Sequence, residues 1–149
     1  MERLEGTKSV LPPAINLLET EAGRWMEGDG IVAFDTWYAQ RKGSSFTVDV
    51  IAAHSDELAM GARSACRAVM NASHREMLLK APLLGIDACP SFGRRLVDSG
   101  QLTASVVTPA TTGDALWSLR RFWESGQPLS LKAFAEPRPY PPSSVAPTP

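Results

Sequence analysis

Four loops of the sequence carry side chains that could bind a ligand, and each loop follows a short run of β-forming residues. They hold Arg24-Trp25, Ser55-Asp56, Asp87-Ala88 and Thr108-Pro109. Carboxylates and hydroxyls exchange hydrogen bonds with the hydroxyl groups of a polyol, and an aromatic face covers the apolar C–H side of a ring. The combination of one aromatic with several short polar side chains therefore predicts a site for a neutral polyhydroxy ligand.

Each of these residues also has a structural interpretation. Asp56 stands at a helix start, so capping of that helix is favoured over contact with a ligand. Ser55 is balanced between capping and recognition, whereas Asp87, just after an apolar strand, leans toward function. Trp25 taken alone would be a core residue. Three further tryptophans lie within helical patterns, where core packing is the expected role: Trp37, Trp117 and Trp123.

No motif for catalysis or a cofactor is present. The sequence lacks GxSxG, HExxH, P-loop and GxGxxG patterns. His54 is a poor base for Ser55, because adjacent residues on a strand point to opposite faces. Cys89 begins a predicted helix, which can lower a thiol pKa, but a small buried residue is the commoner role for it. We therefore expect no enzyme activity, no metal site and no cofactor.

The two cysteines give little information about the compartment. Cys66 and Cys89 lie far apart and form no zinc pattern with His54 and His74. Their spacing neither predicts nor excludes a disulfide between them. The redox state of the compartment stays open as well.

The composition is that of one globular domain. Of the 149 residues, 44% are hydrophobic and 21% are charged. The net charge is -1 with no basic stripe, which argues against nucleic-acid binding. No stretch approaches the roughly 20 apolar residues of a membrane span, and the start lacks the apolar region of a secretory signal. Read literally, the chain is cytoplasmic or a fragment of a longer protein.

Short β-type runs alternate with helical patterns along the chain. Strands are predicted at 14–18, 48–53, 82–86 and 102–107. Helices are predicted at about 27–41, from Ser55 or Asp56 onward, around Phe92 and Leu96, and at 111–125 before Gly126. This alternation predicts an α/β fold with a parallel sheet flanked by helices. Residues 1–136 form the expected domain, and the Pro/Ser-rich tail at 137–149 is expected to be disordered.

Several segments together resemble the carboxyl-terminal portion of the type I periplasmic sugar-binding proteins. Segment 50–62 (VIAAHSDELAMGA) is similar to the family's strand, Asn-Asp and Glu-Met-Ala-Leu-Gly-Ala, in which the glycine and alanines keep the helix close to the sheet. Segment 84–87 (LGID) resembles its strand ending in Gly-aromatic-Asp, and 97–106 (VDSGQLTASV) resembles Asp-Gly-x-Leu-x-Ala-Thr. Gly23-Arg24-Trp25, with Ala33 and Trp37 after it, is similar to the family's loop, aromatic and helix.

The resemblance implies two α/β lobes that close on a sugar, in a receptor for an ABC importer. By position, Trp25 would stack on the sugar and Asp87 would accept two hydroxyls. Ser55 would stand in for an amide that hydrogen-bonds the sugar, and Thr108, also expected at the ligand site, for an amide near the last hinge. The family usually has Asn at Ser55 and an aromatic at Ile86, so the ligand is expected to differ from a common hexose or pentose. Periplasmic location follows from the resemblance alone.

The resemblance covers only part of such a protein. The chain is expected to begin within the helix after the second lobe's first strand, so that it forms one incomplete lobe. The helix at 110–126 would then pack on the missing first lobe, and the family's arginine-bearing helix matches no position here. We expect exposed apolar surface and self-association in the isolated chain.

Three functions remain open at this stage. The chain is a truncated solute-binding component of a sugar transporter that meets an ABC permease, a sugar-sensing domain like that of LacI-type repressors, or a remnant that binds nothing. An upstream first lobe would support the transporter, and an upstream DNA-binding domain would support the regulator.

Overall fold

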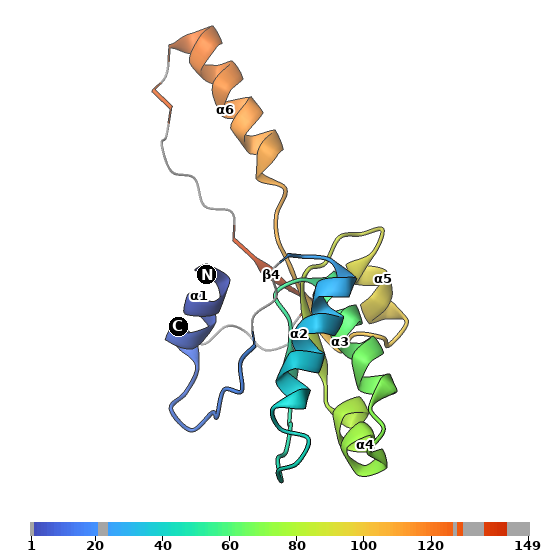
Figure 1. Ribbon diagram of the computed structural model, residues 1–149. Coiled ribbons are helices and arrows are strands. Elements are labelled where there is room, and N and C mark those ends of the chain that lie inside the picture. Colours follow the sequence, from blue (N-terminus) through green and yellow to red (C-terminus); the bar gives the residue numbers. More distant parts are fainter. Residues whose placement is uncertain (1, 21–23, 127, 130–135, 143–149) are drawn as a thin grey trace.

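Four strands form one sheet in the computed structural model, which describes residues 2–20, 24–126, 128–129 and 136–142 (Figure 1). Strands β1 (Ile51–Ala52), β2 (Leu83–Asp87) and β3 (Ala104–Val107) are parallel neighbours in that order. Strand β4 (Arg138–Tyr140) pairs antiparallel with β3. The predicted α/β class and parallel sheet are confirmed.

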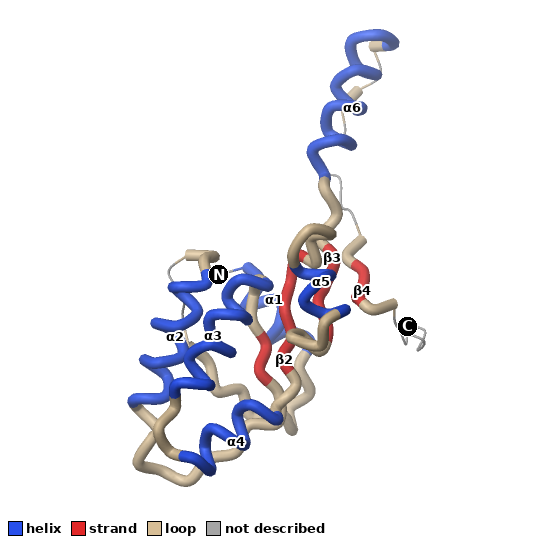
Figure 2. Tube along the Cα trace, turned by 90° about the vertical axis from the view of Figure 1, so that its right-hand side faces the viewer, coloured by secondary structure: helices blue, strands red, loops and turns tan. Residues whose placement is uncertain are grey.

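Six helices are described. They are α1 (Glu2–Val10), α2 (Glu27–Ala39), α3 (Asp56–Ala68), α4 (Ala72–Lys80), α5 (Gly93–Asp98) and α6 (Thr111–Ser125). Helix α3 packs on β2 and carries α2 on its outer side, while α5 lies against β2 and β3. Figure 2 shows α2, α3 and α4 gathered beside the strands. The sequence patterns predicted α2, α3, α5 and α6, and the resemblance placed a helix at the start of the chain, where α1 lies. Nothing in the sequence predicted α4.

Helices α2 and α3 approach each other closely at two glycines. A Cβ on Gly30 would lie 2.4 Å from the carbonyl oxygen of Leu58. A Cβ on Gly61 would lie 2.0 Å from the carbonyl oxygen of Glu27. Gly61 thus brings α3 close to α2, whereas the sequence resemblance had assigned this glycine to contact with the sheet.

The core consists of two clusters of buried side chains. The first lies around the α2–α3 contact and contains Phe34, Trp37, Ala65, Cys66, Val69 and Leu78. The second lies between α3, α5 and the sheet and contains Ala59, Met60, Leu83, Leu96 and Leu102. Trp37 is buried in the first cluster, which confirms its predicted core role.

Two predicted strands differ from the structure. Segment 14–18 has no ladder partner among the described residues, and the Ile15 N–H donates to the carbonyl of Pro12 in a turn instead. A strand persists only where a neighbour satisfies its backbone groups, so β-forming side chains alone did not make one here. Strand β1 shortens to Ile51–Ala52 for the same reason, because only its β2 side is paired.

The carboxyl-terminal segment also departs from the expectation of a disordered tail. Residues 138–140 form β4, in which Tyr140 pairs with Ser105 and Arg138 with Val107. Pro139 lacks a backbone N–H, but an edge strand tolerates that loss. Residues 143–149 lie outside the described part of the chain.

Helix α6 has the predicted bounds, but its tryptophans do not have the predicted core role. It ends at Gly126, whose φ of 65° is the left-handed cap that glycine adopts freely. No described residue of α6 is buried, and Figure 1 shows the helix projecting away from the sheet. Trp117 is 57% and Trp123 75% exposed, so the expected core role is wrong for both. Burial requires an opposing surface, and the described chain offers none to this helix.

Candidate functional site

Asp87 and Thr108 meet at the carboxyl ends of two neighbouring parallel strands. Asp87 is the last residue of β2 and pairs in register with Val107, the last residue of β3. The Thr108 hydroxyl donates to Asp87 Oδ1 at 3.1 Å. The second carboxylate oxygen accepts no bond in the described residues, and the Asp87 side chain is 36% exposed. The predicted neighbourhood of these two residues is therefore present, with a carboxylate that can accept from a ligand.

Arg3 of α1 joins this carboxylate to Trp25, which lies just before α2. Its Nη2 stands 3.1 Å from Asp87 Oδ1, and its guanidinium carbon lies 4.7 Å from the centroid of the Trp25 ring. Its Nη1 donates to the carbonyl of His54. Trp25 is 54% exposed, so its indole is available at the surface rather than buried.

Sequence reasoning missed Arg3. Helix α1 has no apolar face, and it buries none of its described side chains, so no periodic pattern marks it. The contact with Asp87 spans 84 positions and leaves no local signal. The structure thus places an arginine from a helix at the site, although the sequence resemblance matched the family's arginine-bearing helix to no position.

Ser55 lies at the same edge but is not free to bind. It is 1% exposed, and its hydroxyl accepts from the backbone N–H of Leu58 at 3.1 Å as the N-cap of α3. The hydroxyl also donates to the carbonyl of Trp25 at 3.3 Å. The capping alternative therefore describes Ser55 in this structure, and its second bond fixes the backbone of Trp25.

Asp56 does not cap the helix. Its carboxylate turns into the molecule, where it accepts from the backbone N–H of Ala88 at 2.8 Å and from the hydroxyl of Ser105 at 2.6 Å. The side chain is almost wholly buried, and burial raises the pKa of Asp56 because the charged form loses its water. The predicted capping role belongs to Ser55 alone.

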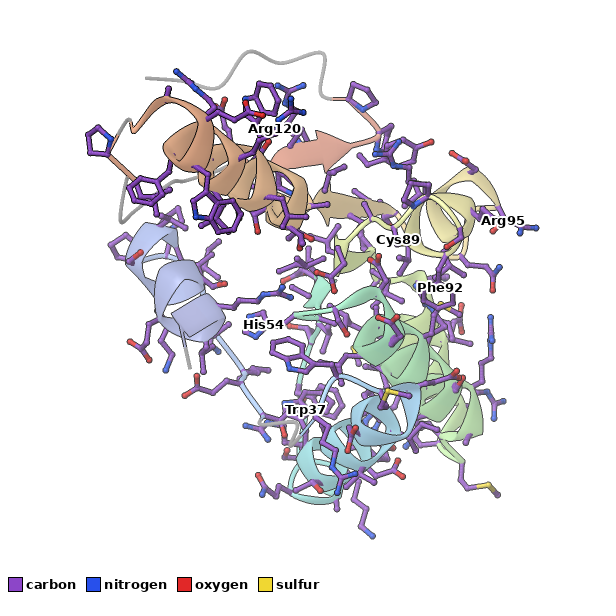
Figure 3. All side chains as sticks on the ribbon, turned by 90° about the horizontal axis from the view of Figure 1, so that it is seen from above. Trp37, His54, Cys89, Phe92, Arg95 and Arg120 are labelled. Atoms are coloured by element: carbon purple, nitrogen blue, oxygen red, sulfur yellow. The ribbon has the colours of Figure 1, made fainter. Side chains whose placement is uncertain are left out.

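His54 sits between α1 and the body of the sheet (Figure 3). Burial lowers its pKa, and the nearby Arg3 cation lowers it further. The imidazole is therefore neutral near pH 7, and its ring makes no hydrogen bond with the Ser55 hydroxyl in the structure. The expectation that the two do not act as a base and nucleophile pair agrees with this geometry.

Both cysteines are free, and the burial predicted from the sequence is wrong for one of them. Cys66 is buried in the core, whereas Cys89 is exposed beside α5 (Figure 3). The expectation of a buried Cys89 is wrong, because the β2–α5 loop turns it outward. A hydrogen bond with the Ser91 hydroxyl lowers the pKa of the Cys89 thiol. The described residues contain no group of three His, Cys, Asp or Glu side chains placed to hold a metal ion.

The charges of the site suit exchange with a polar neutral ligand. The Arg3–Asp87 pair is more than one-third exposed on each side, and such pairs contribute about 0–1 kcal/mol. Hydroxyl groups of a ligand can therefore replace part of this pairing at little cost. An open groove of about 540 Å³ lies nearby and is lined by Val107 at the end of β3, by Pro109 beyond it, and by residues of β4.

Comparison with solved structures decides the kind of fold. The chain superposes with a TM-score of 0.62 at 20% identity on an ABC transporter solute-binding protein from Bacillus halodurans with bound myo-inositol. It superposes with a TM-score of 0.59 at 24% identity on the fructose-binding periplasmic domain of a hybrid two-component system. It has the fold of part of a solute-binding protein. The resemblance found in the sequence is thereby confirmed at the level of the fold.

The solute-binding fold is represented only in part. The match to the myo-inositol-binding protein covers 83% of this chain and 40% of that chain, and the match to the fructose-binding domain covers 77% and 35%. A protein from Mycobacterium smegmatis matches with a TM-score of 0.65 at 17% identity, over 91% of this chain and 42% of its own. No protein-family model and no curated protein matches the sequence. None of the described helices is long and apolar enough to cross a membrane.

Proposed function

We propose that this chain is a carbohydrate-recognition lobe that supplies one side of the sugar-binding cleft of a solute-binding protein. The observation that carries the proposal is the convergence of Trp25, Asp87 and Thr108 at one edge of a parallel sheet. An indole face 54% exposed stands beside a carboxylate with accepting capacity, and Arg3 contacts both. The edge beyond the carboxyl ends of parallel strands is where open α/β sheets bind ligands.

The sugar ring would lie on Trp25 with its hydroxyls directed at Asp87. A ring C–H face and an indole exclude water from each other, and this orients the hydroxyls along the ring edge. Asp87 accepts two of them, and the Thr108 hydroxyl, now bonded to Asp87, turns to a third. Ser55 keeps its cap and supports Trp25 from below, so it makes no ligand bond in this proposal.

The fold shared with solute-binding proteins supports a role for the lobe in transport. We assign it to the periplasmic receptor of an ABC-type sugar importer, in which another lobe closes the cleft from the opposite side and the permease is the partner. The match to only 40% of the myo-inositol-binding protein supports this, because the remainder is large enough for another lobe. Helix α6 would pack on that lobe, which accounts for the exposure of Leu116 and Trp123. This function requires no covalent chemistry and no cofactor.

The test is a nuclear magnetic resonance titration of the full chain with a panel of sugars that includes myo-inositol and D-fructose. One lobe offers half of a cleft, so the measurement must detect weak binding. We expect shifts at the amides of Trp25, Asp87 and Thr108 for at least one sugar. Hydrogen bonds to a charged group contribute roughly 1.5–3 kcal/mol, so Asp87→Ala should raise the Kd at least about tenfold.

Matched variants control for nonspecific effects. Trp25→Ala should weaken binding comparably to Asp87→Ala, whereas Trp123→Ala removes an even more exposed indole from α6 and should leave the Kd unchanged. Asp35→Ala removes an exposed carboxylate from the second half of α2 and should do the same. No saturable shift with any sugar, or equal Kd values for wild type, Asp87→Ala and Trp25→Ala, would contradict the proposal.

A further inference from the structure

The carboxylate of Asp56 is a buried junction between three parts of the fold. Asp56 is the first residue of α3, which begins after the short loop that follows β1, and it is 1% exposed. One oxygen accepts from the N–H of Ala88 in the β2–α5 loop, and the other accepts from the hydroxyl of Ser105 in β3. The residue therefore links the start of α3 to the loop after β2 and to the second residue of β3.

Two glycines leave the space that this carboxylate fills. A Cβ on Gly85 would lie 2.2 Å from Asp56 Oδ1, and a Cβ on Gly93 would lie 1.8 Å from Oδ2. Real side chains do not approach so closely, so any larger residue at either position would displace the carboxylate. The buried position of the Asp56 carboxylate therefore requires glycine at both positions.

The backbone next to this junction is strained. Asp87 has a φ of 108° and Ala88 a φ of 43°, a region that residues with a Cβ rarely occupy. Such conformations are energetically unfavourable and persist only where the surroundings hold them. Both polar groups of the peptide between Asp87 and Ala88 are hydrogen-bonded. Its N–H donates to Asp56, and its carbonyl accepts from the Thr108 N–H at 3.4 Å.

We propose that Asp56 is a positioning residue for Asp87: by binding the Ala88 N–H, it holds the strained turn that directs the Asp87 carboxylate toward Thr108 and Arg3. Ser105 keeps the Asp56 carboxylate oriented through its 2.6 Å bond. The inference rests on the proposed sugar site, because it concerns the residue that would bind the sugar. Asp56 itself is too deeply buried to touch a ligand.

Three variants separate positioning from simple support of the fold. Asp56→Asn keeps an oxygen that accepts from Ala88 and an amide that can donate to the Ser105 hydroxyl. Asp56→Ala removes both bonds, and Ser105→Ala removes only the bond that orients the carboxylate. For the sugar identified in the titration, we expect the Kd to rise at least tenfold in Asp56→Ala. It should stay within about threefold of wild type in Asp56→Asn and lie between these values in Ser105→Ala.

A second measurement follows the turn without any ligand. Amide hydrogen exchange at Ala88 and the carboxyl ¹³C shift of Asp87 report on the two ends of the proposed linkage. In Asp56→Ala, Ala88 should exchange at least tenfold faster and the Asp87 carboxyl resonance should move. Asp56→Asn should restore both, and Asp35→Ala should leave both unchanged. If Asp56→Ala does not fold, the comparison of Ser105→Ala and Asp56→Asn with wild type carries the same expectations.

The outcomes distinguish this inference from the proposed function. Should the wild type bind no sugar, the function fails, and the exchange and carboxyl shift still decide the role of Asp56. A folded Asp56→Ala chain with wild-type Kd, Ala88 exchange and Asp87 shift would overturn the positioning role. The positioning role would also be overturned if Asp56→Ala lowered the free energy of unfolding and left the Kd, the Ala88 exchange rate and the Asp87 shift at their wild-type values.

Discussion

At the scale of single residues, neighbours in the sequence take opposite roles. Ser55 caps α3 and holds the carbonyl of Trp25, and Asp56 turns inward to the Ala88 N–H and the Ser105 hydroxyl. Both are short polar residues that suit a helix start. Their roles differ because the β2–α5 loop places the Ala88 N–H within reach of Asp56. Their substitution should therefore produce different signatures.

Ser55→Ala should lower stability with little effect on binding. Loss of an N-cap hydroxyl typically costs about 1 kcal/mol, and we expect the free energy of unfolding in urea to fall by that amount. The Kd for the sugar should change less than threefold, because Asp87 and the Trp25 ring remain. Ser125→Ala, on the exposed end of α6, serves as the control without effect. A tenfold loss of affinity at unchanged stability would instead place the Ser55 hydroxyl on the ligand.

The two thiols should differ sharply in reactivity. The thiolate is the nucleophile, so an exposed thiol with a lowered pKa reacts faster than a buried one. We expect a colorimetric disulfide reagent to modify Cys89 within the native state and Cys66 only after unfolding. Cys89→Ser should therefore remove the fast-reacting thiol. Fast modification of two thiols in the native chain would contradict the burial of Cys66.

Cys66 should also make stability depend on alkaline pH. Burial raises its pKa from 9.0 to about 11. An acid whose pKa is higher in the folded state stabilises the fold below its unfolded pKa and loses that contribution as pH rises through the folded pKa. Between about pH 9 and 11 the wild type should thus lose up to about 2–3 kcal/mol more unfolding free energy than Cys66→Ala. Parallel pH profiles for the two chains, measured by urea unfolding, would refute this.

At the scale of elements, two tryptophan-bearing helices of similar length have opposite relations to the core. Helix α2 buries Trp37 at 7% exposure against α3, and α6 leaves Trp123 at 75% exposure. Leu116, Leu119 and Trp123 recur at helical spacing on α6, a pattern typical of a helix that contacts another surface. The pattern predicts a partner, and the described chain does not contain it.

Substitution of these two tryptophans should change the free energy of unfolding by very different amounts. Trp37→Ala creates a core cavity and should cost about 3–5 kcal/mol of unfolding free energy. Trp123→Ala should change it by less than about 0.5 kcal/mol, as for surface substitutions in general. Thermal and urea unfolding followed by circular dichroism make the comparison. A loss of several kcal/mol in Trp123→Ala would show that α6 packs on the body of the lobe in solution.

At the scale of the whole molecule, two surfaces lack a neighbour among the residues that the structure describes. Strand β1 is paired only with β2, and α6 buries none of its described side chains. Unpaired strand edges and contiguous apolar surface favour association with another chain. The chain matches only 40% of the length of the solute-binding protein with bound myo-inositol.

The isolated chain should therefore self-associate. Light scattering should give a mass that rises with concentration, and replacement of both Phe122 and Trp123 by Gln should reduce that rise by removing apolar surface from α6. Trp25→Gln, which removes an exposed indole away from α6, is the matched control. A wild-type monomer at all concentrations, with one sharp cooperative unfolding transition, would contradict the expectation.

The sequence by itself determined those features that depend on local pattern. Glycine at 126 predicted the end of α6, apolar runs predicted β2 and β3, and the succession of strand and helix predicted the parallel sheet. Because parallel strands end at one edge, the pattern also brought Asp87 and Thr108 to the same place. Tertiary structure alone decided which groups these residues meet. Arg3 reaches Asp87 across 84 positions, and Asp56 reaches Ser105 across 49. It also decided that Trp37 is buried and Trp123 is not, since periodicity defines an apolar face but burial requires a surface opposite it.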